Sequence, residues 1–514
     1  MPARKIAVHL AMAALSLCVA LRMGAQSKTS AAPAERIEAR VVDLSLGGNE
    51  PPLRLGLQRL MQLYQVPGLS IAVIDDFRIA WTGAYGVVEV GSARPVTPGT
   101  LFQAGSISKP VAAAGALRLV EQGRLSLDED VNSRLQTWKV PENEFTRTEK
   151  VTLRRLMSHT AGLTVGGFPG YETGAHIPTL AQILDGTKPA NTPAVRVDLV
   201  PGTRVRYSGG GVTVEQLLMM DVTGKPFPAL MRELVLDRIG MTGSGYEQPL
   251  PPARAAVAAS GADTGGKTIP GRWHVYPEMA AAGLWTTPTD LANFAVEIAL
   301  SRHGKSNRIL SEKMTALMLT PVLGEAGLGF FLDPDSPGEF GHNGADEGFQ
   351  SLLWMNSETG KGVAIMANSD NGNAVGDLLL RAVAREYGWN YKDPEQGAFG
   401  ALMLVAKTRG TAAALRLYTE FQKPGDGTYR VAEWTLDRMG HRLLDSGQNE
   451  DAIGVFRRNV REYPKSARAC DSLGDAYAKT GQKDLAIHSY EMSLQLDPND
   501  QRATDRIRDL KGIK

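Results

Sequence analysis

Cysteine is nearly absent from this chain, which has two in 514 residues. Cys18 lies in an apolar N-terminal stretch, and Cys470 lies close to the C-terminus. If the N-terminal segment is removed, Cys470 is the one cysteine that stays. The sequence therefore excludes a disulfide within the mature chain and a cysteine-based metal cluster.

An excess of charge of one sign is lacking too, since 56 lysines and arginines stand against 55 aspartates and glutamates. This balance gives no electrostatic reason to expect binding to nucleic acid or to an anionic membrane surface. The eight histidines are dispersed and no His-Glu-x-x-His sequence occurs, so no metal site is expected. A Gly-x-Ser-x-Gly elbow, typical of α/β-hydrolases, is also missing.

The first 25 residues have the organisation of a secretory signal peptide. Arg4 and Lys5 form a basic start, the run 6–21 is mostly apolar, and small residues precede Gln26. The apolar run is short for a membrane-spanning helix. We therefore expect cleavage before Gln26 and a periplasmic or secreted protein, with an uncleaved anchor as the alternative.

The length of the chain predicts more than one domain. We expect a signal peptide over 1–25, a linker over 26–50, a main domain over 51–392, a helical connector over 393–432 and repeats over 433–514. Within the main domain, runs of β-forming residues at 69–74 and 78–82 predict an early hairpin, and two later strands are expected at 349–355 and 362–367. Strands at both ends with helices between them indicate an α+β fold whose sheet joins early and late segments.

Residues spaced by 34 positions match in the C-terminal part. The pairs are Gly440 and Gly474, Gly447 and Gly481, Ala452 and Ala486, Phe456 and Tyr490, and Pro464 and Pro498. This period resembles tetratricopeptide repeats. Two units alone are marginal, so we expect either a further helix pair from the stretch 398–421 or docking on the main domain. The repeats either bind a peptide or partner protein or only pack as an appendage, and both interpretations stay open.

Ser106 and Lys109 lie three residues apart, which places both on one face of a helix. The pattern over 107–122 is helical, and Pro110 is tolerated only near a helix start, so the helix begins close to Ser106. A lysine can take the proton of a serine only if its pKa falls well below about 10.4. The plainer interpretation of this spacing is a serine that caps the helix, followed by a solvated lysine.

Two other segments favour the catalytic interpretation: Arg206-Tyr207-Ser208-Gly209-Gly210 and Phe340-Gly341-His342-Asn343-Gly344. With Ser-x-x-Lys, their order and spacing resemble the serine β-lactamase and penicillin-binding protein superfamily. The similarity is greatest to its class C β-lactamase-like branch, which includes family VIII carboxylesterases and D-amino-acid peptidases. The stretches 66–73, 123–128, 156–163 and 283–287 fit that branch as well, and the resemblance covers about residues 52–391.

The resemblance implies a β-lactamase-like antiparallel sheet flanked by helices, together with a helical domain. It implies that Ser106 attacks a carbonyl group and forms an acyl-enzyme, while Lys109 and Tyr207 share the proton transfers. The backbone N–H groups of Ser106 and Ala345 would form the oxyanion hole. His159 looks catalytic in isolation, but within the stretch 156–162 we expect it to fix a loop instead.

Four more positions follow from the resemblance, two of which depart from its pattern. His342 is expected in the catalytic group where penicillin-recognising members have lysine, and a neutral imidazole attracts a carboxylate less strongly. Gly209 replaces a frequent asparagine but is still expected at the substrate, beside Asn343 and Gly344. Gly344 would let the strand approach the substrate closely. Both departures favour an esterase or a small peptidase over a dedicated β-lactamase.

The sequence therefore predicts an exported serine hydrolase that needs no cofactor and cleaves an ester, or an amide such as a D-amino-acid peptide or a β-lactam. The competing hypothesis is a low-turnover penicillin-binding or sensor protein whose repeats recruit a partner.

Overall fold

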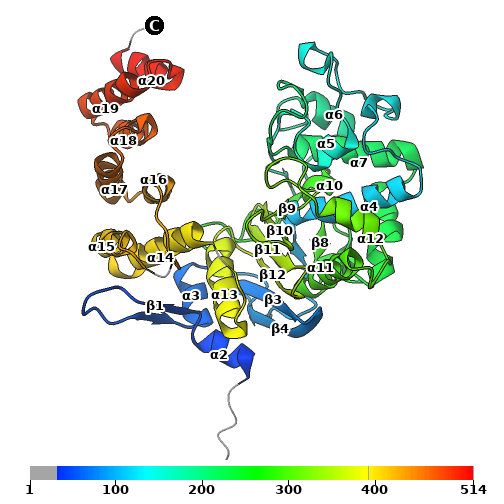
Figure 1. Ribbon diagram of the computed structural model, residues 1–514, viewed down its shortest axis with the longest axis horizontal. Helices are drawn as coiled ribbons and strands as arrows, with labels where there is room; N and C mark the ends of the chain where they lie inside the picture. The colour runs from blue at the N-terminus through cyan, green and yellow to red at the C-terminus, as the bar shows by residue number, and fades with distance from the viewer. Residues whose placement is uncertain (1–31, 392, 426, 513–514) are drawn as a thin grey trace, which may run out of the picture.

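A six-stranded antiparallel sheet forms the centre of the molecule (Figure 1). The computed structural model describes residues 32–391, 393–425 and 427–512, so the predicted signal peptide lies outside the described residues. In order across the sheet the strands are β4 (Arg78–Gly86), β3 (Gly68–Asp75), β12 (Lys361–Ala367), β11 (Phe349–Asn356), β10 (Glu339–Asp346) and β9 (Phe331–Leu332).

The strand β3, which lies between β4 and β12, is buried on both faces. Ala72 and Ile74 contact one hydrophobic core, whereas Ile71 and Val73 contact the other. A strand with two buried faces has apolar residues at successive positions, which is why this segment shows no polar alternation. The early hairpin and both late strands are confirmed, and β12 pairs with β3 from Gly362 opposite Ile74 to Ala367 opposite Leu69. The predicted α+β sheet of early and late segments is confirmed.

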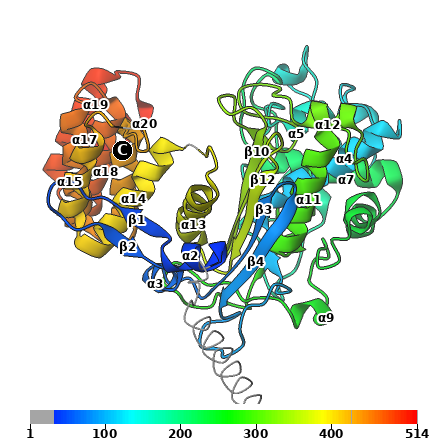
Figure 2. The same cartoon turned by 60° about the horizontal axis from the view of Figure 1, so that its bottom comes forward.

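Helices cover both faces of the sheet (Figure 2). One face is covered by α11 (Pro288–Arg302), and the other by α13 (Gly372–Tyr387). The other helices of this part are α2 (Pro33–Ala39), α3 (Leu57–Leu63), α4 (Ser108–Glu121), α5 (Leu153–Met157), α6 (Leu180–Asp185), α7 (Gly209–Thr223), α8 (Phe227–Met231), α9 (Pro252–Ala255), α10 (Met279–Ala282) and α12 (Glu312–Met318). Small two-stranded sheets pair β1 (Val42–Leu44) with β2 (Leu53–Leu55), β5 (Phe102–Gln103) with β8 (Trp285–Thr286), and β6 (Tyr171–Glu172) with β7 (His274–Val275).

The linker predicted for 26–50 is wrong over much of its described part. Residues 33–39 form α2, which packs against α13, and residues 42–44 form β1. Ile37, Val41 and Val42 are buried in the same core as α13. Leu44 and Leu46 are buried in that core as well, and the burial of these apolar side chains holds the segment on the domain.

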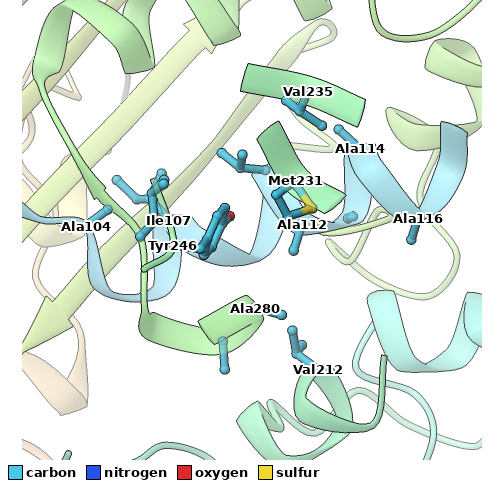
Figure 3. Packing of buried hydrophobic residues seen from close by; sticks show 14 of the residues in the cluster. Ala104, Ile107, Ala112, Ala114, Ala116, Val212, Met231, Val235, Tyr246 and Ala280 are labelled. Carbon is cyan, nitrogen blue, oxygen red and sulfur yellow. The ribbon is translucent and has the colours of Figure 1, made fainter. Parts of the chain in front are cut away.

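Helix α4 lies in an apolar environment on all sides (Figure 3). Its residues from Ser108 to Leu117 are all buried, and four alanines and a glycine among them let neighbouring elements approach closely. Tyr246 packs beside the helix and its hydroxyl donates to the Ser108 carbonyl at 2.8 Å. A helix that is enclosed in this way has a fixed N-terminus, which is the end that carries Lys109 and that follows directly on the turn of Ser106.

The C-terminal part is an array of antiparallel helices (Figure 1). Its helices are α14 (Pro394–Arg409), α15 (Thr411–Phe421), α16 (Glu433–Asp445), α17 (Asn449–Glu462), α18 (Ala467–Lys479), α19 (Lys483–Leu496) and α20 (Gln501–Lys511). In each predicted repeat a glycine of the first helix lies against an aromatic ring of the second, Gly440 against Phe456 and Gly474 against Tyr490. This contact recurs with the period of 34 residues that the sequence shows.

Both expected sources of support for the two repeats are present. The helices α14 and α15 form a further pair that contacts α16 and α17, and a single hydrophobic core extends from the sheet through this pair into the repeats. The repeats therefore share buried apolar surface with the main domain. Among the described residues, none of the helices combines the length and apolarity needed to cross a bilayer.

Candidate active site

Ser106 and Lys109 face each other at the start of α4. Ser106 lies in a 3₁₀ turn, Gly105–Ile107, and Lys109 lies in the first turn of the helix that follows. Lys109 Nζ is 2.8 Å from Ser106 Oγ and donates a second hydrogen bond to the Ala281 carbonyl, also at 2.8 Å. Lys109 is 3% exposed. The plainer interpretation, a capping serine and a solvated lysine, is therefore wrong.

Burial lowers the pKa of the Lys109 amine to about 7, because an ammonium group loses its hydration inside the protein. The negative charges of Asp346 and Glu215 act in the opposite direction and favour the ammonium. Desolvation is the larger effect. A large fraction of Lys109 is consequently neutral near pH 7 and can accept the proton of the adjacent hydroxyl.

Tyr207 lies beside this pair, two residues before α7. The Lys109 Nζ is 4.9 Å from the centre of its ring, and the phenol is hydrogen-bonded to the side chain of Ser106. Burial raises the pKa of Tyr207 to about 12, so the phenol keeps its proton at neutral pH. His159 fixes this loop, as predicted, because its Nδ1 accepts from the Ser208 N–H at 3.2 Å and its ring lies 4.4 Å from that of Tyr207.

His342 closes the other side of the cluster, 6.0 Å from Tyr207 between ring centres. It is 6% exposed, and its Nδ1 lies 2.5 Å from the Asn343 carbonyl oxygen. Burial, with the charge of Lys109, lowers the pKa of His342 to about 3, so the imidazole is neutral. Nδ1 therefore donates to the carbonyl, and Nε2, which has no hydrogen-bond partner, presents a lone pair.

The strand β10 lies directly against the turn that carries Ser106. A side chain on Gly344 would meet the Ala104 carbonyl oxygen at 1.9 Å, and one on Gly105 would meet the Ala345 nitrogen at 2.4 Å. The backbone of Ala345 thus lies next to the turn, where the predicted oxyanion hole requires it. The role predicted for Gly344 needs correction: its lack of a side chain lets the strand approach the Ser106 turn, not the substrate.

The remaining predicted residues differ in their exposure. Asn343 is exposed and faces a groove on the outer side of β10. Gly209 is buried, its N–H donates to the Gly166 carbonyl at 3.0 Å, and its own carbonyl accepts from the Thr213 hydroxyl at 3.1 Å. Phe168 occupies the direction in which a side chain would point. Gly209 therefore has no free polar group to offer a substrate.

Three buried carboxyl groups near the site were not anticipated from the sequence. Burial raises the pKa of Glu215 and of Glu278 to about 8, and raises that of Asp346 well above its ordinary value. Glu215 could have been noticed, because it is the one charged residue in the apolar run 212–220. In the described part of the chain, no group of three or more histidine, cysteine, aspartate or glutamate side chains is arranged to hold a metal ion.

The fold and this cluster of serine, lysine and tyrosine define a member of the penicillin-binding protein and β-lactamase class of serine hydrolases. The chain belongs to the β-lactamase family, whose model matches residues 56–387, and a tetratricopeptide repeat model matches residues 467–500. The resemblance predicted from the motifs is confirmed.

Known proteins of this kind are distant relatives. The chain is 28% identical over 326 residues to penicillin-binding protein 4 of Amycolatopsis lactamdurans, covering 59% of this chain and 81% of the relative. It is 28% identical over 241 residues to a β-lactamase of Pseudomonas fluorescens, covering 46% of this chain and 61% of the relative. The octameric penicillin-binding protein homologue from Pyrococcus abyssi superposes with a TM-score of 0.53 at 22% identity, over 65% of this chain and 77% of that one. At this identity the structural likeness concerns the fold alone.

Proposed function

We propose that this protein hydrolyses a carboxylic ester or an amide through an acyl-enzyme formed on Ser106. The observation that carries the proposal is the 2.8 Å contact between Ser106 Oγ and a fully buried Lys109 amine whose pKa is lowered to about 7. An amine that is neutral and adjacent to a hydroxyl supplies the general base that a serine nucleophile needs.

In the acylation step, Ser106 Oγ bonds to the substrate carbonyl carbon while its proton passes to Lys109 Nζ. The carbonyl oxygen becomes an oxyanion, which the N–H groups of Ser106 and Ala345 stabilise. The bond between carbon and leaving group then breaks as a proton is delivered to that group. Tyr207 suits this delivery because it is a protonated phenol that contacts both Ser106 and Lys109.

Deacylation reverses the same proton transfers with water in place of the leaving group. A water molecule gives its proton to Lys109 or Tyr207 as its oxygen bonds to the acyl carbon, and Ser106 Oγ leaves with a proton. The product is a carboxylic acid, and the enzyme returns to its initial state without a cofactor.

Charge at the cleft favours esters and simple amides over β-lactams. A β-lactam carries a carboxylate, which a cationic side chain beside the strand would bind. His342 lies at that position, and its lowered pKa of about 3 leaves it uncharged. Replacing a cationic side chain by a neutral imidazole does not weaken the binding of a neutral substrate, whereas an anionic substrate loses an ion pair.

A substrate panel tests the proposal. Purified protein is incubated with a short-chain p-nitrophenyl ester, a chromogenic cephalosporin and a D-alanyl dipeptide, and product is measured against the Ser106→Ala variant. We expect multiple turnovers of the ester that the variant lacks, and slower hydrolysis of the cephalosporin. No turnover of any of the three substrates would refute the enzymatic proposal.

The competing function, a low-turnover sensor whose repeats recruit a partner, is supported by the core that the repeats share with the sheet. It predicts one stable acyl adduct per protein with a β-lactam and no continued product release. Intact-protein mass spectrometry after mixing separates the two functions, because a hydrolase returns to its unmodified mass.

We also propose that the protein is exported to the periplasm or secreted, from the basic start and apolar run of residues 1–25. Expression of the full chain in a Gram-negative host, followed by N-terminal sequencing of the periplasmic fraction, tests this. We expect a mature N-terminus at Gln26, and retention of Met1 in the cytoplasm would contradict it.

A further inference from the structure

The segment 327–332, which ends in β9, is fixed against the first turns of α4. Gly329 has a φ of +92°, and a side chain there would meet the Ala113 side chain at 2.6 Å and the Pro110 backbone at 3.2 Å. Its N–H donates to the Met157 carbonyl at 3.0 Å. The segment therefore lies against the part of α4 that carries Lys109.

Two phenylalanines follow Gly329 and have different surroundings. Phe330 is buried in the core, where its ring lies 4.8 Å from that of Phe340. Phe331 is partly exposed, and its backbone pairs with Gly341 on one side and with Ala326 on the other. The core accounts for Phe330, whereas the position of Phe331 has to be explained by what its ring contacts.

The ring of Phe331 lies against three rings of the active site. Its centre is 6.1 Å from that of Tyr207 and 6.1 Å from that of His159, with interplanar angles of 24° and 21°. The ring of His342 is 5.3 Å away at 42°. Rings at these separations are in aromatic contact. Phe331 thus joins side chains that come from the end of α5, the start of α7 and β10.

Tyr207 connects Phe331 to the reacting groups. The Tyr207 phenol is hydrogen-bonded to Ser106, and the centre of its ring is 4.9 Å from Lys109 Nζ. A phenol hydroxyl keeps its position only while its ring is held, and the stacking of Phe331 and His159 on Tyr207 supplies that support. Phe331 therefore acts on the reaction through Tyr207.

The state of Lys109 depends on the exclusion of water from this cluster. His159 and His342 both have pKa values lowered to about 3 and are neutral, and burial keeps Tyr207 protonated as well. The charges of Glu215 and Asp346 favour the Lys109 ammonium, and desolvation outweighs them.

Phe331 stands at the boundary between this cluster and the solvent. It is partly exposed and also lines a groove on the outer side of the sheet, whereas His159 and His342 are 5% and 6% exposed. A smaller side chain at position 331 would open a path from the groove to the three rings and, beside Tyr207, to the amine.

We propose that Phe331 is a positioning residue, which holds the Tyr207 phenol against Ser106 and keeps water away from the Lys109 amine. The inference rests on the proposed hydrolase function and adds to it a residue that shapes the proton transfers without touching the reacting atoms.

Kinetics of Phe331→Ala test the positioning role with a neutral p-nitrophenyl ester. We expect the plateau kcat to fall about 10²-fold while KM changes less than about threefold, because the phenol loses its alignment. The acid limb of the pH profile should move from about 7 to higher pH by about one unit, because water that enters the cluster stabilises the ammonium.

Two further variants separate this role from a general loss of stability. Phe331→Leu keeps an apolar side chain over the cluster, so its acid limb should return to about 7 and its kcat should exceed that of the alanine variant. The matched control is Phe421→Ala, which removes a partly buried ring stacked 4.3 Å from Tyr429 among the C-terminal helices and should leave kcat and the limb unchanged. Wild-type kinetics in Phe331→Ala would overturn the inference. An equal loss in Phe421→Ala, or a limb that stays in place in every variant, would overturn it too.

A measurement without turnover distinguishes failure of this inference from failure of the proposed function. The histidine ring signals are followed by NMR from pH 8 to pH 4.5. His159 and His342 should stay neutral over this range in the wild type and should titrate within it in Phe331→Ala, because hydration favours the imidazolium. If the ester is hydrolysed and both proteins titrate alike, the hydrolase stands and the role of Phe331 is wrong. If no ester is hydrolysed but the histidines of the variant titrate, the proposed function is wrong and Phe331 still covers the cluster.

Discussion

The protonation of Lys109 should govern the dependence of activity on pH. Burial lowers the pKa of this amine from 10.5 to about 7, which corresponds to about 5 kcal/mol of lost ammonium stability. Only the neutral amine can accept the Ser106 proton, so kcat/KM for a neutral ester should rise with pH and level off above about 8. Below the pKa each pH unit should reduce the rate about tenfold, leaving about one hundredth of the plateau at pH 5.

Other groups that titrate in this range can be separated from Lys109 by substitution. The two histidines of the site have pKa values lowered to about 3, so they do not produce a limb near 7. Glu339, whose pKa is raised to about 7, is removed by Glu339→Gln, which should leave the acid limb in place. Glu215 and Glu278, whose pKa values are raised to about 8, are removed by Glu215→Gln and Glu278→Gln. The charge of ionised Glu215 favours the Lys109 ammonium, so Glu215→Gln should move the acid limb to lower pH, whereas Glu278→Gln should leave it in place.

The assay is stopped-flow hydrolysis of a p-nitrophenyl ester from pH 4.5 to pH 10, with circular dichroism at each pH to confirm that the protein stays folded. Three results would refute the reasoning: a limb near 10, no limb at all, or a limb that moves to higher pH in Glu215→Gln. The first would mean that Lys109 is solvated during catalysis, and the second that another group takes the serine proton.

Other substitutions have outcomes that follow from single contacts. Tyr207→Phe removes the phenol hydrogen bond to Ser106 and should lower kcat by about 10²–10⁴-fold without changing the fold. Turnover at the wild-type rate in this variant would show that Tyr207 transfers no proton during catalysis. Gly344→Ala would place a methyl group 1.9 Å from the Ala104 carbonyl oxygen, so it should lower the free energy of unfolding by about 3 kcal/mol and abolish ester turnover. An unchanged stability in denaturant titration would contradict the packing of β10 against the Ser106 turn. Gly440→Ala and Gly474→Ala should each destabilise the repeats by about 1–3 kcal/mol in thermal melts, because the rings of Phe456 and Tyr490 fill the space that a methyl group would need. Gly454→Ala in α17 meets open space and should instead stabilise the repeats by about 0.5–1 kcal/mol.

Local patterns in the sequence predict much of the fold and the central part of the site. The early hairpin and the late strands are visible in a single sequence as local runs of β-forming residues. The repeats are visible as small, aromatic and proline residues that recur every 34 positions. The spacing of Ser106 and Lys109 likewise fixes their meeting on one turn, because helix geometry allows little else.

Long-range packing accounts for what the sequence did not reveal. Residues 33–44 look like a polar linker until α13 provides the surface that buries Ile37 and Val42. Gly209 sits in a motif whose relatives often carry a polar side chain, yet Phe168 excludes one here.

Labelling by a fluorophosphonate at pH 8 tests most directly whether a buried amine activates Ser106. The wild type and the Lys109→Met variant, whose apolar side chain of similar length suits the buried site, are treated with the probe and mapped by peptide mass spectrometry. The account predicts a single adduct on Ser106 in the wild type and at least a hundredfold slower labelling in a variant that keeps its thermal melt. An adduct on another serine, or labelling of Ser106 at the wild-type rate without Lys109, would contradict it.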